Sequence, residues 1–426
     1  MNTIFIQIAS FRDPQLKPTI IDLLNNAKYP NNLRVAICNQ YNPEDEFNID
    51  EYRDDNRFKI VDVLDVDSKG VCWARHQVQQ LYDNEKYTLQ IDSHMRFEKD
   101  WDETLIKMIK QLQKKGHKKP LLTGYVSSFD PENDPKGRVN EPWRMSFDRF
   151  TPEGVVFFLP EVIPNWKKLK SPIPSRFYSA HFAFTLGKFS TEVQHDPEFY
   201  FHGEEISISV RSFTHGYDLF HPHKVVVWHE YTRKGRIKQW DIDKEWYKKN
   251  EACHIKNRQL LGIDDEVFTG NTLDWFGTER TIKDYEKYSG ILFSKRAIQQ
   301  YTKDKEYPPN PYNYNTNEEW VDSFTTIFKH CIDMSFDNVP EKDYDFWVVA
   351  FHNEKNETLF RQDADLNEIN RMMQDPDRYC KIWREFHTKE KPKYWVVWPH
   401  SISKGWCERI VGSLWYEFLF YNILFW

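Results

Sequence analysis

The sequence lacks the features that mark secreted, disulfide-linked and membrane-spanning proteins. Its six cysteines are scattered and form no CxxC pair, which predicts reduced thiols in a cytoplasmic protein. The opening "MNTIFIQIAS" alternates like a strand and has no basic region before an apolar core, so it does not read as a secretory signal. No run approaches the ~20 consecutive apolar residues of a membrane-spanning helix.

A positive net charge is also missing. The formal net charge is −7 at pH 7, so no global positive field attracts nucleic acid, and we expect no nucleic-acid partner. Hydrophobic residues make up 40% and aromatic residues 16% of the chain, which supports packed cores and argues against disorder. A length of 426 residues is enough for two or three domains.

Short β-rich runs alternate with helical patterns over the first hundred residues. The β-rich runs are "TIFIQIAS", "LRVAICN", "FKIVDVLDV" and "YTLQID", and helical spacing falls at 16–27 and 73–84. This alternation predicts an α/β, Rossmann-like fold, with a mostly parallel sheet and helices on both faces. Ligands of such sheets bind beyond the carboxyl ends of the strands.

The rest of the chain is predicted with less regular structure. Residues 130–178 look like a long loop region, and a helical stretch over 365–386, interrupted at Pro376, lies between two β-rich runs. We expect a catalytic domain, a connecting segment, a small α+β or β-rich domain, and an apolar tail that docks on the protein itself, a partner or a membrane face. Their predicted bounds are 1–300, 301–340, 341–410 and 411–426.

An aspartate and a histidine stand two residues apart in "YTLQIDSHMRF", where a predicted strand ends. Asp92 and His94 can face the same point, and a carboxylate with an imidazole suits a borderline divalent ion such as Mn²⁺. A third ligand is required, and His229, after the predicted strand "KVVVW", is placed to supply it. His221 and His223 compete for that role. Taken alone, the pair also fits a loop histidine hydrogen-bonded to a nearby aspartate.

Further motifs, in a fixed order, favour the metal interpretation. "IASFRDP", "GVCWAR", "LQIDSHMRF", "SAHFAF", "FHGEEIS" and "WHEYTR" follow one another over roughly residues 1–300. The series resembles the polypeptide and hydroxyproline α-N-acetylglucosaminyltransferases of glycosyltransferase family 60 and, more distantly, the polypeptide N-acetylgalactosaminyltransferases. The resemblance implies a GT-A fold, UDP-GlcNAc as donor, Mn²⁺, and retention of anomeric configuration.

The resemblance also implies roles for single residues. Asp92, His94 and His229 would hold Mn²⁺ or Mg²⁺, which bridges both phosphates and stabilises UDP as it leaves. Arg12 would contact phosphate and Asp13 the uracil or ribose, with a polar turn after the first strand as the alternative. The full set implied around the nucleotide and donor sugar is Ser10, Arg12, Asp13, Gly70, Arg75, His181, Tyr231 and Arg233.

Two adjacent glutamates, Glu204 and Glu205, are the candidate catalytic residues. Glu204 aligns with the glutamate of the galactosaminyl W-G-G-E-N motif, which faces the donor sugar or the acceptor hydroxyl; stabilisation of a helix start is the alternative. Phe201, His202 and Glu205 differ from that motif, so its sugar contacts do not transfer. Because the resemblance supplies no dedicated nucleophile, we expect front-face attack rather than double displacement.

These patterns predict a retaining, metal-dependent transferase that moves GlcNAc from UDP-GlcNAc to a hydroxyl of a protein (Ser, Thr or hydroxyproline) or of a glycan. A metal-dependent UDP-sugar hydrolase is a second class, but the several Asp/His/Asn clusters typical of two-metal phosphoesterases are missing from the sequence. A non-catalytic sugar-binding module is a third class. The presence of Asp92, His94, Glu204 and His229 together argues against it.

Overall fold

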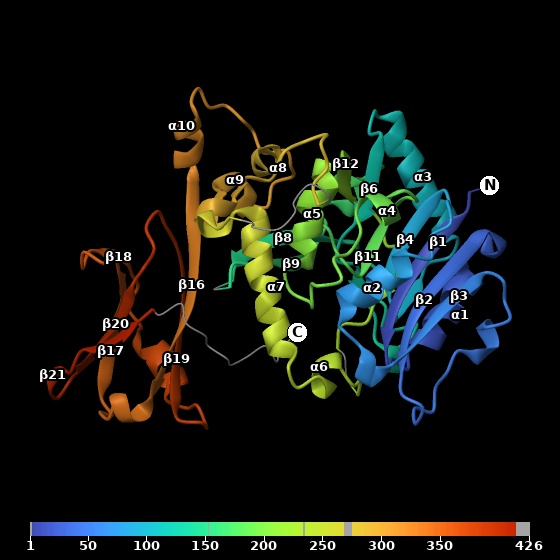
Figure 1. Cartoon of the computed structure of the whole chain (residues 1–426). Helices are drawn as coiled ribbons and strands as arrows, with labels where there is room; N and C mark the ends of the chain where they lie inside the picture. Colours follow the sequence, from blue (N-terminus) through green and yellow to red (C-terminus); the bar gives the residue numbers. More distant parts are fainter. Residues whose placement is uncertain (1, 152, 233–234, 268–274, 415–426) are drawn as a thin grey trace. The chain divides into compact units, whose positions relative to one another are not determined.

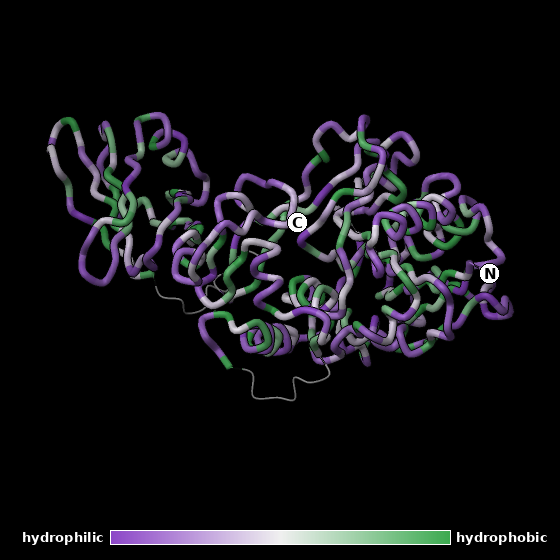
Figure 2. Tube along the Cα trace, turned by 90° about the horizontal axis from the view of Figure 1, so that it is seen from above, coloured by the Kyte–Doolittle hydropathy of each residue, from purple (hydrophilic) through white to green (hydrophobic). Residues whose placement is uncertain are grey.

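The computed structural model describes residues 2–151, 153–232, 235–267 and 275–414. The chain divides into two compact units. The described residues up to Ser294, together with Tyr301–Tyr312, form the first unit. Lys295–Gln300 and the described residues from Asn313 onward form the second. Hydrophobic segments lie mostly inside each unit, and hydrophilic segments are frequent in the loops at its surface (Figure 2).

The first unit is built on an eight-stranded sheet with the order β10-β12-β6-β11-β4-β1-β2-β3 (Figure 1). β1 pairs in parallel with β2 and β4, β2 with β3, and β6 with β12, whereas β11 runs antiparallel between β4 and β6. The sheet is therefore mostly parallel, as predicted. Its strands are β1 (Ile4–Phe11), β2 (Leu33–Tyr41), β3 (Phe58–Leu64), β4 (Tyr87–Asp92), β6 (Lys119–Thr123), β10 (Ile173–Pro174), β11 (Phe182–Leu186) and β12 (Tyr217–His221).

Helices cover both faces of this sheet because both sides of its central strands are apolar. In β1, Ile6 and Ile8 join a core cluster with residues of α1 and α3, while Phe5 points the other way and packs with Ala74 and Val78 of α2. The predicted two-sided α/β arrangement is confirmed. The helices of the first unit are α1 (Leu16–Asn26), α2 (Val71–Gln79), α3 (Trp101–Lys114), α4 (Phe189–Glu192), α5 (Glu204–Thr214), α6 (Gln239–Ile242), α7 (Trp246–Leu261), α8 (Ile282–Ser289) and α9 (Gln300–Lys303, whose first residue falls in the second unit).

A small second sheet brings distant residues to the end of β4. β5 (Met95–Phe97) follows β4 after a two-residue turn and pairs antiparallel with β13 (Val227–His229), which also pairs with β7 (Ser127–Ser128). The register sets His229 opposite Met95. A residue more than a hundred positions away thus lies beside the turn that follows β4.

The region 130–178 differs from the predicted loop. β8 (Trp143–Phe150) and β9 (Val156–Val162) form an antiparallel hairpin, and β8 carries the buried side chain of Phe147. Phe158 of β9 is buried as well. The many Pro, Asn and Lys residues of this region indicated a loop. The hairpin was not predicted because only a few inward-facing aromatic residues supply its packing.

The second unit is rich in strands, which confirms the predicted β-rich C-terminal part. Buried Trp347, Ile382 and Phe386 belong to one core cluster shared by its strands. β16 lies inside the predicted connecting segment 301–340, so ordered structure begins earlier than that prediction. The elements are β15 (Ala297–Gln299), α10 (Asn317–Asp322), β16 (Phe324–Ser335), β17 (Tyr344–His352), β18 (Thr358–Arg361), α11 (Leu366–Met372), β19 (Tyr379–Thr388), β20 (Tyr394–Ser401), β21 (Gly405–Trp406) and β22 (Ile410–Ser413).

The helix predicted over 365–386 is only partly correct. α11 ends at Met372, and Tyr379–Thr388 is the strand β19. Buried Ile382 and Phe386 alternate with exposed Trp383 along β19, which is a period of two rather than 3.6. Of the apolar tail, residues 415–426 lie outside the described residues. Among the described residues, no helix has the length and apolarity needed to cross a membrane.

Candidate active site

Three predicted ligands converge where β4, its following turn and β13 meet. The Oδ2 atom of Asp92 lies 3.7 Å from Nε2 of His94 and 3.4 Å from Nε2 of His229. One ligand atom from each residue lies within 4.8 Å of the others. His221 points elsewhere, since its Nδ1 bonds to the carbonyl oxygen of Thr123. His229, and not His221, therefore stands with the D-x-H pair.

Asp13 fixes the orientation of His94. Its Oδ2 lies 2.7 Å from Nδ1 of His94 and also accepts hydrogen bonds from Ser93 (2.7 Å) and Arg236 (3.0 Å). Burial raises the pKa of the Asp13 carboxyl, but the bonds and charges of His94 and Arg236 outweigh burial and hold that pKa well below its usual range. An ionised Asp13 keeps the proton on Nδ1 and leaves Nε2 of His94 as a ligand atom.

The donor set fits a divalent ion. Burial lowers the pKa of His229 to about 4, so its imidazole is neutral at pH 7 and has a free lone pair. Its Nδ1 is buried and has no hydrogen-bond partner among the described residues. Two imidazole nitrogens and one carboxylate oxygen suit a borderline ion such as Mn²⁺. Three protein ligands also leave coordination positions for oxygen atoms of a substrate.

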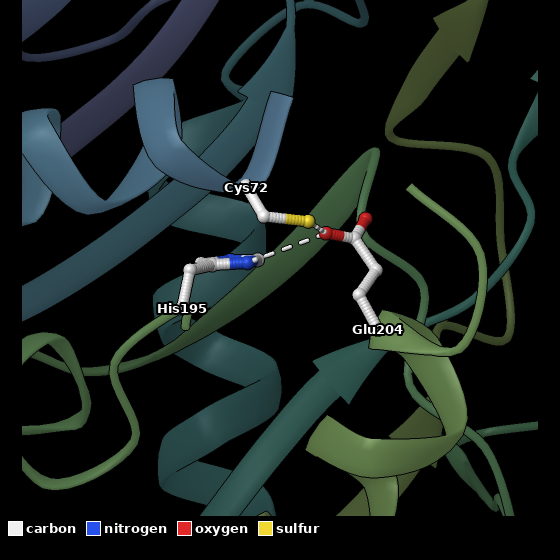
Figure 3. A group of neighbouring side chains, drawn as sticks. All are labelled: Cys72, His195 and Glu204. Atoms are coloured by element: carbon white, nitrogen blue, oxygen red, sulfur yellow. Dashed lines mark hydrogen bonds and ion pairs between the residues drawn. The ribbon is translucent and has the colours of Figure 1, made fainter. Parts of the chain in front are cut away.

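Arg75 connects Asp92 to Glu204. One guanidinium nitrogen donates to Oδ1 of Asp92 at 2.7 Å, which leaves Oδ2 facing the histidines, and the other donates to Oε1 of Glu204. Glu204 is only 6% exposed, and its Oε2 accepts a hydrogen bond from the thiol of Cys72 (Figure 3). Burial raises the pKa of Glu204, but the positive charge of Arg75 outweighs burial and lowers that pKa to about 2. Cys72 lies in the "GVCWAR" motif but was given no role from the sequence, and His195 lies outside the quoted motifs.

Glu205 has different surroundings from its neighbour. It is half-buried, accepts a hydrogen bond from the backbone N–H of Ala180 at 2.8 Å, and accepts a second from the hydroxyl of Tyr125 at 3.2 Å. Burial raises the pKa of Glu205 to about 7. The Tyr125 ring stacks on His181 with ring centroids 5.2 Å apart, and His181 stacks on His229 at 4.4 Å. A continuous row of side chains thus links Glu205 to the predicted metal ligands.

His181 and Tyr231 both lie at the predicted site. The Tyr231 hydroxyl donates to the carbonyl oxygen of Val126 at 2.7 Å and lies 3.3 Å from Nε2 of His181. The rings of Tyr231 and His229 pack edge to face, with centroids 4.3 Å apart. Arg233, predicted to close over the diphosphate, lies outside the described residues.

Of the remaining predicted nucleotide residues, Ser10 lies near the end of β1, Arg12 follows β1, and Gly70 lies between β3 and α2. Arg12 is paired with Asp45 (2.6 Å) and Asp65 (3.0 Å), so its charge is already balanced by two carboxylates. The carbonyl oxygen of Ser10 accepts from the Gln40 amide. Gly70 precedes α2 with φ of 107°, and a Cβ there would lie 2.9 Å from the Tyr200 ring. These contacts leave the predicted nucleotide roles untested.

The chain matches the family model described as Glycosyltransferase (GlcNAc), over residues 3–58 and 46–303. This covers well over half of the sequence, and the chain belongs to that family. The observed sheet is mostly parallel, with β11 antiparallel between β4 and β6 and β10 antiparallel at one edge, and agrees with the GT-A type of α/β fold predicted above. The narrower assignment to family 60 stays a prediction. No curated protein matches the chain.

Solved structures show weak similarity to the chain. GalNAc-T7 with UDP, GalNAc and Mn²⁺ matches at 14% identity and a TM-score of 0.43, over 67% of this chain and 54% of that one. S. aureus TarS 1–349 in complex with UDP-GlcNAc matches at 12% identity and a TM-score of 0.36, over 60% of this chain and 67% of that one. The match thus spans about half the length of GalNAc-T7. Similarity at this level assigns neither a donor nor a metal to this chain.

Proposed function

We propose that this glycosyltransferase is metal-dependent and transfers GlcNAc from UDP-GlcNAc to a hydroxyl acceptor with retention of configuration. The observation that carries the proposal is the convergence of Asp92, His94 and His229 at the carboxyl end of a parallel strand, within a member of a GlcNAc glycosyltransferase family. In α/β sheets this edge is where nucleotide ligands bind.

Asp92, His94 and His229 would hold a Mn²⁺ or Mg²⁺ ion, which would supply positive charge to stabilise UDP as the leaving group. The protein's own contribution is to hold the three ligands in place. Asp13 fixes the tautomer and orientation of His94, and Arg75 holds one oxygen of Asp92 so that the other faces the histidines. Ser10, Arg12, Asp13 and Gly70 are proposed to line the nucleotide side.

The sugar side is proposed to lie along His181, Tyr231 and Glu205. Glu205 is the better candidate of the two glutamates for contact with the sugar, because Glu204 is occupied by Arg75 and Cys72. Glu204 then acts through Arg75 as a positioning residue. Neither glutamate has a free, ionised carboxylate suited to be a nucleophile, which supports front-face attack, with the leaving phosphate accepting the proton of the acceptor hydroxyl.

The acceptor is proposed to be a protein hydroxyl (Ser, Thr or hydroxyproline) or a glycan. The transfer chemistry belongs to the predicted catalytic domain, residues 1–300. The β-rich C-terminal part is proposed to serve acceptor or partner binding, and the apolar tail to contact a partner or a membrane surface.

The test measures UDP release from UDP-GlcNAc and Mn²⁺, with and without hydroxyproline peptides, Ser/Thr peptides and oligosaccharides. Release that an acceptor accelerates, with an α-linked GlcNAc product by NMR, is the expected result. Equal release without acceptor indicates a hydrolase, and a β-linked product contradicts retention. A panel of other UDP-sugars tests the donor, because faster release from another sugar refutes the assignment of GlcNAc.

A further inference from the structure

A second group of ligand-type side chains lies apart from the predicted Asp92 site. Cys72 is in the first turn of α2, Glu204 begins α5, and His195 lies in the segment between α4 and α5. Their side chains point toward one another (Figure 3), and Sγ, Nδ1 and a carboxylate oxygen lie within 4.8 Å of each other. All three residues are buried, at 0%, 2% and 6% exposure for Cys72, His195 and Glu204.

Hydrogen bonding fixes the protonation of His195. The amide nitrogen of Gln90 donates to the carbonyl oxygen of Ala180 at 2.6 Å, so the amide oxygen of Gln90 is the acceptor. That oxygen lies 2.6 Å from Nε2 of His195, which must therefore carry the proton. Nδ1 of the neutral ring is then a bare lone pair, and it faces Oε2 of Glu204 at 3.5 Å.

Sγ of Cys72, Nδ1 of His195 and Oε2 of Glu204 lie close together, and only one hydrogen atom, that of the thiol, is available to bond between them. The thiol of Cys72 has one hydrogen, which it donates to Oε2 of Glu204. Nδ1 of His195 is left as a buried nitrogen without a hydrogen-bond partner among the described residues. Buried polar atoms in folded proteins are almost always paired, and the unpaired Nδ1 of His195 directs its lone pair at the same point as Sγ of Cys72 and Oε2 of Glu204.

We propose that Cys72, His195 and Glu204 bind a zinc ion through Sγ, Nδ1 and Oε2. Thiolate, imidazole and carboxylate are the usual protein ligands of zinc, whereas the Asp/His/His set at Asp92 has no sulfur. Zinc uptake forms the Zn–S bond and releases the thiol proton to solvent. The ion's two charges are balanced by the thiolate and the Glu204 carboxylate.

The residues around the group match those that usually surround metal ligands. A histidine that binds a metal typically donates its other ring N–H to an oxygen, and His195 donates to Gln90. A carboxylate that binds a metal is typically hydrogen-bonded as well, and the second oxygen of Glu204 is held by Arg75. Arg75 is in turn balanced by Asp92. The zinc ion would thus anchor the arginine that orients Asp92, although zinc binding itself does not depend on the proposed transfer reaction.

The experiment uses the full chain and two readouts. Zinc content is measured by mass spectrometry after incubation with ZnCl₂ and gel filtration, in a His94→Ala/His229→Ala background that removes the other metal site. We expect about one zinc ion per chain in that background. Co²⁺ is then added to wild-type protein, where a thiolate-to-cobalt absorption band is expected, because only a cysteine ligand produces it.

Variants locate the site. Cys72→Ser keeps a hydroxyl that can donate to Glu204, so a purely hydrogen-bonded group would tolerate it. Our expectation is that Cys72→Ser loses the bound zinc and the cobalt band, whereas Cys253→Ser, a change at a neighbouring buried cysteine outside the group, keeps both. If the wild-type protein gives no cobalt band, or if Cys72→Ser binds zinc as wild type does, the zinc site is refuted. Absence of transfer activity in wild-type protein that binds zinc as expected would instead contradict the proposed function alone.

Discussion

Replacing Asp13 by Asn separates two roles for this residue. Asp13 was predicted to contact the uracil or ribose, but its Oδ2 bonds to His94, Ser93 and Arg236. Asn has no charge, and its amide NH₂ offers donors where Ser93 and Arg236 also donate. We therefore expect Asp13→Asn to loosen His94 and to weaken metal binding more than nucleotide binding.

The magnitude follows from the bond that is lost. A hydrogen bond to a charged group contributes roughly 1.5–3 kcal/mol, and loss of a partner behind a metal ligand typically costs about 10–100-fold in metal affinity. At about 1.4 kcal/mol per tenfold, this corresponds to ~1.4–2.8 kcal/mol. We expect the apparent Mn²⁺ constant for UDP release to rise by that factor, while KM for UDP-GlcNAc at saturating Mn²⁺ changes less than about threefold.

The assay is a Mn²⁺ titration of UDP release, with Mn²⁺ binding measured separately by calorimetry. The control is Asp62→Asn, which removes the same charge from a carboxylate paired with Arg53. An unchanged Mn²⁺ constant in Asp13→Asn, with a large rise in the KM for UDP-GlcNAc, would show that Asp13 acts mainly in nucleotide binding and not through His94.

Three further predictions concern the residues around the site. Gly70→Ala should lower the free energy of unfolding by roughly 1–3 kcal/mol in urea denaturation, because φ at Gly70 is 107° and the new Cβ would clash with Tyr200. Gly116→Ala is the control, because Gly116 has a similar φ of 99° but open space around its Cβ position, and it should cost less. Equal losses in the two variants would show that the contact with Tyr200 adds nothing. Arg75→Lys should weaken Mn²⁺ binding about tenfold in calorimetry, because one ammonium group cannot replace the two-pronged guanidinium; wild-type affinity would contradict its positioning role. Because burial raises the pKa of Glu205 from 4.5 to about 7, the stability contributed by its protonated form is present below about pH 4.5 and lost as pH rises through about 7. Glu205→Gln should therefore gain stability relative to wild type between those pH values, and parallel pH curves would refute that shift.

Local patterns predicted most of the first unit. Runs such as "TIFIQIAS" are apolar on both sides, and that is the property of a strand buried in a parallel sheet. The D-x-H pair could be placed at a strand end because it follows another such apolar run, "YTLQID". Residues 143–162 and 379–388 were misassigned, because short buried strands with polar outer faces resemble loops or helices when the pairing partner is unknown.

The contacts between distant residues could not be predicted from the sequence. Asp13 was named, but its bond to His94 spans 81 positions. Cys72 in "GVCWAR" and His195 between α4 and α5 are far apart in the sequence and lie beside Glu204 only in the folded chain. The fold determines which distant residues come into contact, so the spacing of residues along the sequence does not predict these contacts.

Mn²⁺-dependent UDP release from UDP-GlcNAc in His229→Ala and His223→Ala tests the central claim most directly. His223 is a buried histidine on the same segment and lies outside the group formed by Asp92, His94 and His229. We expect His229→Ala to lose nearly all Mn²⁺-dependent release and His223→Ala to keep it. Full Mn²⁺-dependent release by His229→Ala would contradict the proposed metal site.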